Sequence, residues 1–321
     1  MTPDYVTCSN LIIDDIVLAD GRSFMNTLGG AGTHALVGMR VWSAQLGFIG
    51  TVGADFDPQH REILEGLGID LRGLVERPGY RTARAWQLFE PDERRVEVFR
   101  TNEEEFNRLK PQFADIPADY LTAKGFHLQW GTFAELIDLV ARLRAVNPPI
   151  CLVWEPPLTL HTVPPAEIQA LLAQIDLFSP DLGEAQALTG ERAPERALAM
   201  LQEWSTGLVA LRMGAQGSFV ATAAGERYHV PAVPTIIVDI TGAGNAYCGG
   251  FLTGLGAGLG VVEAAARAAV SASFALEQFG VPLFTPEKDA EAERRLAWAL
   301  ERIVPYTGAL SMSEMSWPGT A

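Results

Sequence analysis

The sequence predicts an α/β protein in which a doubly wound, mostly parallel sheet is flanked by helices and carries a small β-sheet lid. Three observations support this fold class. Short apolar, β-branched runs alternate with longer segments whose apolar residues recur at helical spacing. Two other stretches are strand-like but have no helix between them and the next strand. At 321 residues the chain is also long enough to bury a large core in one domain.

The main sheet is expected from four apolar runs separated by helical segments. The strands are GFHLQW (125–130), ICLVWE (150–155), IDLFSP (175–180) and LVALRM (208–213). The helices between and after them are FAELIDLVARLRAV (133–146), PPAEIQALLAQ (164–174) and APERALAMLQEW (193–204). Because parallel strands need a crossover connection, this alternation predicts right-handed βαβ units.

The lid is expected from residues 10–21 and 81–100. AWQLFE and RVEVFR alternate apolar and polar residues, with a turn at Pro91-Asp92 between them. Since these stretches lack crossover helices, we expect a second small sheet, suited to close over a substrate cleft. One domain should then span residues 1–305, and residues 306–321, which show no periodicity, should form a C-terminal tail.

Charge and cysteine usage limit the class of partner. The net charge of -15 argues against a nucleic-acid or anionic-membrane surface, since both need a basic patch. Cys8, Cys151 and Cys248 are widely spaced and form no CxxC pair, which is typical of core thiols in a reducing compartment. No signal peptide or membrane-length apolar segment is evident, so we expect a cytoplasmic protein.

The strongest functional motif begins at residue 239 and reads DITGAGNAYCGGFLTGLGAGLG. Val233 to Asp239 is strand-like, a glycine turn follows, and the remainder has the character of a helix. Backbone N–H groups at such a helix N-terminus point outward, and the helix dipole adds positive potential. This arrangement predicts an anion hole for a transferring phosphoryl group. The alternative is that the glycines only permit close packing of helix and sheet.

Two further motifs follow buried strands. In SPDLGEAQALTG (179–190), Asp181 and Glu184 are three residues apart and could hold Mg²⁺ through water. The alternative is helix capping by Asp181 with a solvated Glu184. In LRMGAQGSFV (211–220), Gly214 and Gly217 could let a nucleotide lie against the backbone, but a simple hairpin would use the same residues.

A fourth motif lies near the N-terminus, in LGGAGTHALVGMRVWSAQLGFIGTVGADF (28–56). Gly29 and Gly30 precede a helix and would let a small polar ligand approach the chain, or they form a tight turn. Asp14 and Asp15 in IIDDIV are the other candidates for ligand binding. Because successive strand residues point to opposite faces, at most one of the two should face the ligand.

Taken in this order, the four motifs resemble those of the PfkB (ribokinase-like) carbohydrate kinase family over nearly the whole chain. LGGAGTHA is similar to the family's GG motif, DLGE to NxxE, RMGAQG to TxGxxG, and DITGAGN to DTxGAGD. The resemblance implies ATP-dependent phosphoryl transfer to a hydroxyl of a sugar, nucleoside or polyol. It also implies ATP and Mg²⁺ as cofactors, K⁺ in many members, and homodimers that often form through the lid.

The resemblance assigns a role to each matching residue, and Asn245 stands at the position of the family's catalytic base. Substrate binding falls to Asp14, Gly29, Gly30 and His34; the anion hole to Gly242, Ala243 and Gly244; nucleotide binding to Asp181, Glu184, Arg212, Gly214 and Gly217; Mg²⁺ to Glu184; and the monovalent cation to Asp239 and Thr241.

Four of these positions depart from the family pattern. His34 and Asp181 replace asparagines, Arg212 replaces a threonine, and Asn245 replaces the aspartate that takes the proton. Asp181 and Arg212 have opposite charges, and we expect them to compensate one another if they lie close together. The motif GGAGT and a signature ending in asparagine also resemble a divergent fungal branch of the family.

The substitution at residue 245 leaves three interpretations open. An amide has no useful basicity near neutral pH, and a general base typically contributes ~10²–10⁴-fold to the rate. The chain is then a divergent kinase with another base or a more acidic acceptor, a pseudokinase that binds nucleotide or sugar in a regulatory or scaffold role, or a kinase whose base was changed deliberately. The other three departures favour natural divergence.

Overall fold

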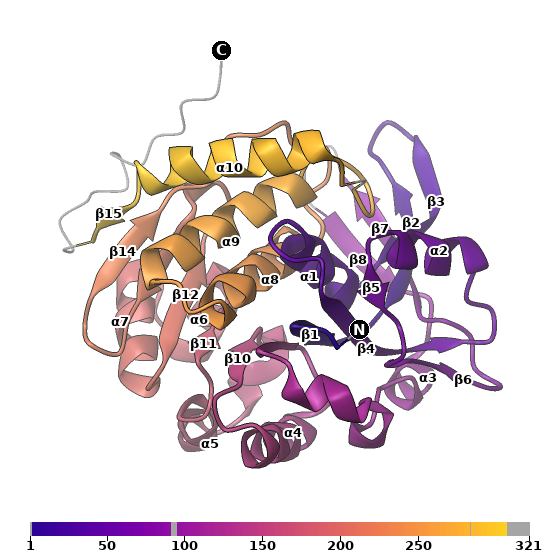
Figure 1. Cartoon of the computed structure of the whole chain (residues 1–321), viewed down its shortest axis with the longest axis horizontal. Coiled ribbons are helices and arrows are strands. Elements are labelled where there is room, and N and C mark those ends of the chain that lie inside the picture. The colour runs from indigo at the N-terminus through magenta and orange to yellow at the C-terminus, as the bar shows by residue number, and fades with distance from the viewer. Residues whose placement is uncertain (1, 91–94, 283, 307–321) are drawn as a thin grey trace.

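The computed structural model describes residues 2–90, 95–282 and 284–306 (Figure 1). The turn expected at Pro91-Asp92 lies outside these ranges, as does the expected tail beyond residue 306. The division into one domain over residues 1–305 stays a prediction. No helix in the described ranges is both long enough and apolar enough to cross a bilayer.

A large central sheet confirms the predicted doubly wound architecture. Its strands are β1 (Tyr5–Cys8), β4 (Leu46–Gly53), β5 (Ile69–Asp70), β6 (Leu74–Arg77), β9 (Gly125–Leu128), β10 (Cys151–Trp154), β11 (Leu177–Phe178), β12 (Leu208–Arg212), β13 (Ser218–Ala221), β14 (Arg227–Val230) and β15 (Val304–Pro305). Their order is β15-β14-β13-β12-β11-β10-β9-β1-β4-β5, and β6 also pairs with β4. Pairing is parallel from β12 to β5, whereas β13, β14 and β15 are antiparallel.

Helices cover both faces of this sheet (Figure 1). One face carries α1 (Ala31–Arg40), α8 (Ala243–Gly256), α9 (Val261–Ala275) and α10 (Pro286–Leu300), and the other carries α4 (Phe133–Val146), α5 (Pro165–Leu172), α6 (Leu182–Thr189) and α7 (Pro194–Trp204). Strand β10 contributes to both cores, because successive side chains point to opposite faces. Val153 packs with the first group of helices, while Leu152 and Trp154 pack with the second.

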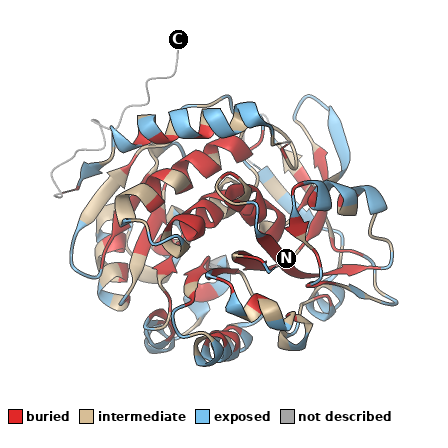
Figure 2. Ribbon diagram, viewed as in Figure 1, coloured by how far each residue is buried: buried red, intermediate tan, exposed pale blue. Residues whose placement is uncertain are grey.

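The strands and helices predicted between residues 125 and 213 are confirmed. Helix α4 spans the predicted residues 133–146, and a reciprocal pair of hydrogen bonds between Thr132 and Glu135 fixes its first turn. The central strands and the middle of α8, from Ala246 to Gly254, are among the most deeply buried parts of the described chain (Figure 2). Polar groups at the ends of these strands are therefore held by a rigid core.

The prediction of a strand over Val233–Asp239 is wrong. These residues have no regular structure, and Ile236 is 79% exposed. Pro231 and Pro234 remove two backbone donors, and the amide of Val238 instead donates to the carbonyl of Leu276 at 2.7 Å. The chain therefore enters α8 from an irregular segment that a helix carbonyl anchors.

A small second sheet confirms the predicted lid. Its order is β3 (Ser23–Gly29), β2 (Ile12–Val17), β7 (Arg84–Phe89) and β8 (Arg95–Phe99). The β2–β3 and β7–β8 pairs are antiparallel, and β2–β7 is parallel. Strands β2, β7 and β8 arise from the two predicted stretches. Strand β3 was not predicted. The predicted lid stretch ended at residue 21, and Gly29, the last residue of β3, was assigned to the diglycine motif instead. Two other described helices, α2 (Pro58–Gly66) and α3 (Glu103–Arg108), lie near this end of the molecule (Figure 1).

Helices α1 and α8 approach each other until their backbones touch. A Cβ at Gly38 would overlap the carbonyl oxygen of Ala246, and one at Gly249 would overlap that of Ala35. Glycine is the one residue that permits this approach. The contact fixes the N-terminus of α8 relative to that of α1, so the two glycine motifs are held side by side.

We predict that Gly38→Ala lowers the free energy of unfolding by about 1–3 kcal/mol, because the new methyl group must displace helix backbone. Urea denaturation followed by circular dichroism measures this. Gly66→Ala is the matched control, since no atom lies within 4 Å of a Cβ at that helix position. It should be neutral or slightly stabilising. Equal effects of the two substitutions would contradict close contact between α1 and α8.

Candidate functional site

The N-terminus of α8 presents backbone donors without backbone acceptors. Gly242 caps the helix with φ 76°, a left-handed conformation that favours glycine. Within the described residues, the amides of Gly242 and Gly244 have no backbone partner, and that of Ala243 has only a 3.5 Å contact with the carbonyl of Ile240. Three donors and the positive end of the helix dipole thus converge, as an anion-binding site requires.

Glycines at this site make room for polar side chains. A Cβ at Gly242 would overlap the ring of His34, one at Gly29 would overlap the carboxylate of Asp14, and one at Gly244 would overlap the guanidinium of Arg212. The alternative that the glycines serve packing alone applies to Gly249, but not to these three. The structure therefore brings His34 and Arg212 to the predicted anion hole and Asp14 to the diglycine motif.

The carboxyl ends of three neighbouring parallel strands supply further charged groups. Glu155 directly follows β10, Asp181 follows β11, and Arg212 ends β12. In a doubly wound sheet these ends lie along one edge, where ligands bind. Asp181 and Arg212 also form a parallel β-bridge, so the two residues are neighbours, as expected.

Glu155 is a buried carboxylate with three polar partners. The Nη1 atom of Arg212 lies 2.9 Å from Oε1, the Nδ2 atom of Asn245 donates to Oε2 at 2.6 Å, and the Nε2 atom of His127 lies 3.3 Å from Oε2. Burial alone raises the pKa of Glu155, but Arg212 and then His127 and Asn245 more than offset this and lower the pKa to about 2. Glu155 is therefore anionic at neutral pH.

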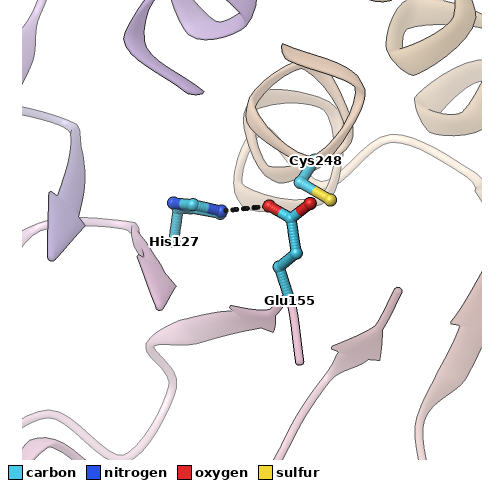
Figure 3. A group of neighbouring side chains, drawn as sticks. All are labelled: His127, Glu155 and Cys248. Carbon is cyan, nitrogen blue, oxygen red and sulfur yellow. Dashed lines mark hydrogen bonds and ion pairs between the residues drawn. The ribbon is translucent and has the colours of Figure 1, made fainter. Parts of the chain in front are cut away.

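His127, Glu155 and Cys248 lie close enough together to be considered as metal ligands (Figure 3). Two observations favour a hydrogen-bonded cluster instead. Burial raises the pKa of the Cys248 thiol to about 12, and a cation here would lie beside the Arg212 guanidinium that already pairs with Glu155. Thr7 in addition holds the other ring nitrogen of His127 at 2.9 Å. We assign His127 a structural role in fixing Glu155, and Cys248 that of a buried neighbour.

Asp181 and Glu184 form a capping box at the start of α6. The Asp181 carboxylate accepts from the amide of Glu184, and the Glu184 carboxylate accepts from the amide of Asp181, both at 2.7 Å. Asp181 therefore caps the helix as the alternative reading had it, but Glu184 is not simply solvated. Its Oε2 lies 3.4 Å from Arg212, so Glu155 and Glu184 are the carboxylates that pair with Arg212 directly. Asp181 also raises the pKa of Arg212 through its charge, but less than either glutamate, so the expected compensation is electrostatic and secondary.

Asp14 and Asp15 have different surroundings, although both are buried. Asp15 is paired with Arg100 and accepts from the amide of Asn26. Asp14 accepts from the side chain of Gln87 at 3.0 Å and forms no ion pair within the described residues, and burial raises its pKa to about 7 although the charge of Arg95 acts against this. Asp15 is therefore committed to contacts within the protein, whereas ligand binding by Asp14 stays a prediction.

His34 lies against Gly242 in a neutral form. Burial, and to a lesser extent Arg95, lowers the pKa of its ring to about 4. Its Nε2 atom is buried and has no hydrogen-bond partner among the described residues. An unpartnered buried nitrogen next to the helix terminus is suited to a hydrogen bond with a bound ligand.

Gly214 and Gly217 lie in the connection between β12 and β13, both with positive φ. The two strands are antiparallel, so the hairpin alternative for this motif describes its backbone correctly. Asp239 is buried and accepts from the amide of Thr241 at 2.8 Å. Burial raises the pKa of Asp239, as expected for a carboxylate held without a strong counter-ion.

The comparison with known proteins decides the family. A model of the pfkB family of carbohydrate kinases matches residues 6–288. The chain belongs to the PfkB family. This confirms the resemblance of the four motifs and the ribokinase-like fold that it implied.

Several relatives and structural neighbours of the chain are kinases. An uncharacterized protein of Schizosaccharomyces pombe is 29% identical over 326 residues, 89% of this chain and 88% of its own. A cytidine kinase of Thermococcus kodakarensis is 25% identical, and the match covers 79% of this chain and 89% of the kinase. A ribokinase II candidate of Escherichia coli, solved with ATP and Mg²⁺, superposes with a TM-score of 0.74 at 20% identity. The superposition covers 92% of this chain and 99% of that protein.

Three residues at this PfkB site were not predicted from the sequence. Glu155 had a weak signal, because it is a charge directly after a buried strand. Gln87 bridges Asp14 and Glu97 from the lid. Arg95 of β8 donates to the hydroxyl of Thr241 at 3.2 Å. The lid residues carry no local signal, since any alternating strand places polar residues on one face.

We predict that Asp14→Asn makes stability less dependent on pH. A carboxyl group whose pKa is raised on folding stabilises the protein below the unfolded value of about 3.9. That contribution is lost as the pH rises to about 7. The variant should therefore gain stability relative to the unaltered protein between pH 4 and pH 7.5, by a few kcal/mol at most.

Urea denaturation at several pH values measures this difference. Asp20→Asn is the matched control, because Asp20 is exposed and pairs with Arg22. Its difference from the unaltered protein should stay constant from pH 5 to pH 8. A constant difference for Asp14→Asn as well would show that Asp14 is ionised without penalty in the folded protein.

Proposed function

We propose that this protein binds MgATP and transfers the γ-phosphoryl group to a hydroxyl of a small sugar, nucleoside or polyol. The observation that carries the proposal is the convergence of the free α8 amides with His34 and Arg212. The buried Asp14 on the lid adds a hydrogen-bond acceptor for a substrate hydroxyl. Phosphoryl transfer depends mainly on positioning and charge stabilisation, which such a set of groups can supply.

The related proteins support the nucleotide and the substrate class. One relative is a cytidine kinase, and one neighbour in fold was solved with ATP and Mg²⁺. We assign Mg²⁺ to Glu184, because burial and the neighbouring Asp181 raise the pKa of this carboxyl group to about 7, and a bound cation would favour its ionised form. When bound there, Mg²⁺ would neutralise charge on the nucleotide phosphates. We extend the proposal to K⁺ at Asp239 and Thr241.

The residues of the chain would divide the remaining work. The α8 amides at Gly242, Ala243 and Gly244 would bind the transferring phosphoryl group. Asp14 would accept a hydrogen bond from a substrate hydroxyl, and the neutral His34 would orient the same ligand. Gly29 and Gly30 would keep the backbone close to that ligand, and Gly214 and Gly217 would border the nucleotide. Asn245 cannot take the proton, so turnover would be slow or need an acidic acceptor.

A pseudokinase is the second candidate, and one contact favours it. The amide nitrogen of Asn245 is held by Glu155, so this side chain is committed to a structural hydrogen bond. Such a protein would bind nucleotide or sugar for a regulatory or scaffold role. For either function we propose a cytoplasmic homodimer through the lid, where Met25 on β3 and Val98 on β8 are exposed apolar residues.

The test is MgATP turnover with a panel of sugars, nucleosides and polyols, combined with thermal shifts by ATP and ADP. We expect turnover with at least one acceptor, and its loss in Asp14→Asn. A rise in Tm with nucleotide but no turnover with any acceptor would replace the kinase by the pseudokinase. No rise in Tm with either nucleotide would reject nucleotide binding altogether.

We also predict that the lid arginine takes part in ligand binding. Arg95→Met should lower the kcat/KM for the acceptor by about 10-fold or more, or make the thermal shift by MgATP smaller. The reason is that hydrogen bonds to charged groups are worth about 1.5–3 kcal/mol. Arg22→Met is the matched control on the lid, because the side chain of Arg22 pairs with Asp20 alone among the described residues. Equal binding by Arg95→Met and Arg22→Met would exclude Arg95 from the site.

A further inference from the structure

The contact between Asn245 and Glu155 determines how the amide is oriented. A carboxylate only accepts hydrogen bonds, so the Asn245 atom 2.6 Å from Glu155 Oε2 is the amide nitrogen. The amide is planar, with its oxygen on the other side of Cγ, so Oδ1 points away from Glu155. Asn245 is partly exposed, whereas Glu155 is only 5% exposed. The buried Glu155 therefore determines how the side chain of Asn245 is oriented.

The charge of Glu155 is in turn fixed by Arg212. Arg212 binds Oε1 at 2.9 Å, which leaves Oε2 for Asn245 and His127. Its Nη2 also donates to the carbonyl of Ser179 at 2.9 Å, so the guanidinium is held on two sides. The departures at residues 212 and 245 are thus two contacts of one buried carboxylate.

We propose that Glu155 is a positioning residue that reserves position 245 for a neutral side chain and directs the oxygen of Asn245 toward the ligand. Asn245 then acts as a fixed hydrogen-bond acceptor, not as a proton-accepting base. The inference rests on the proposed function only in placing a ligand at the start of α8. The coupling between the two side chains is a property of the protein without ligand.

A carboxylate at position 245 is incompatible with this arrangement. Asn245→Asp would place a second carboxylate against Glu155, where the amide nitrogen now donates. Two carboxylates in contact cannot both ionise without a large penalty. Changing Asn245 back to the family's aspartate is therefore expected to fail as a repair unless Glu155 is neutralised in the same protein.

The test is a double-mutant cycle of Asn245→Asp and Glu155→Gln, with Tm measured at pH 8 without ligand. We expect Asn245→Asp to lower Tm by about 5–10 °C beside Glu155 and by less than about 2 °C beside Gln at 155. Its penalty beside Glu155 should shrink at pH 5, because the introduced carboxyl group then takes up a proton. Equal penalties in the two backgrounds, or a penalty independent of pH, would overturn the proposal.

The matched control is Glu184→Gln, the other carboxylate that pairs with Arg212. Glu184 has no contact with Asn245 in the described residues, so Glu184→Gln should not reduce the loss of Tm caused by Asn245→Asp. Equal relief by Glu184→Gln would mean that general charge, not contact, couples the positions, and would overturn the proposal. If Glu155→Gln alone does not fold because Arg212 loses its 2.9 Å partner, the same cycle is run in Glu155→Gln/Arg212→Met, with the same expectations.

Activity separates this inference from the proposed function. With the acceptor that serves the unaltered protein, MgATP turnover by the double variant should exceed that of Asn245→Asp by about 10-fold or more, because an aspartate can then act as a base. A thermal-shift failure with ATP in every variant would reject the kinase proposal, while the ligand-free cycle would still report on Glu155. A double variant that is stabilised but no faster than Asn245→Asp would overturn the ligand-directed role of Asn245.

Discussion

The buried ion pair between Glu155 and Arg212 is the interaction on which the site depends. It joins the ends of β10 and β12 to the first turn of α8, since the guanidinium lies against Gly244 and the carboxylate binds Asn245. Removing one partner of such a pair leaves an uncompensated buried charge, which typically costs about 3–5 kcal/mol. The pair therefore fixes both the geometry of the helix terminus and the kind of residue that position 245 accepts.

Most of the fold was predictable because its signal is local. Helical spacing over 133–146 sufficed for α4, and alternation in AWQLFE sufficed for β7, since burial of one face imposes these periods. The failure at Val233–Asp239 has a nonlocal cause. Ile236, Ile237 and Val238 are exposed there, because two prolines and the carbonyl of Leu276 determine the backbone instead.

The site was predictable to a similar extent and for similar reasons. Gly29, Gly242 and Gly244 were found because close approach to a side chain requires glycine at those places. Glu155 and Arg95 were not found, since their roles come from contacts with residues far away in the chain. Glu155 pairs with Arg212, and Arg95 donates to Thr241. Arg212 was expected to be balanced by Asp181, which caps α6 and acts on Arg212 through its charge, while Glu155 and Glu184 pair with it directly.

A crystal structure of the protein with Mg²⁺ and a non-hydrolysable ATP analogue tests the central claim most directly, because it shows the terminal phosphate and the Asn245 contact together. We expect the terminal phosphate beside the amides of Gly242–Gly244, with Glu155 still bound to Arg212 and Asn245. A nucleotide bound elsewhere, or a Glu155 carboxylate turned away from Asn245 toward the metal ion, would contradict the role that we assign to this ion pair.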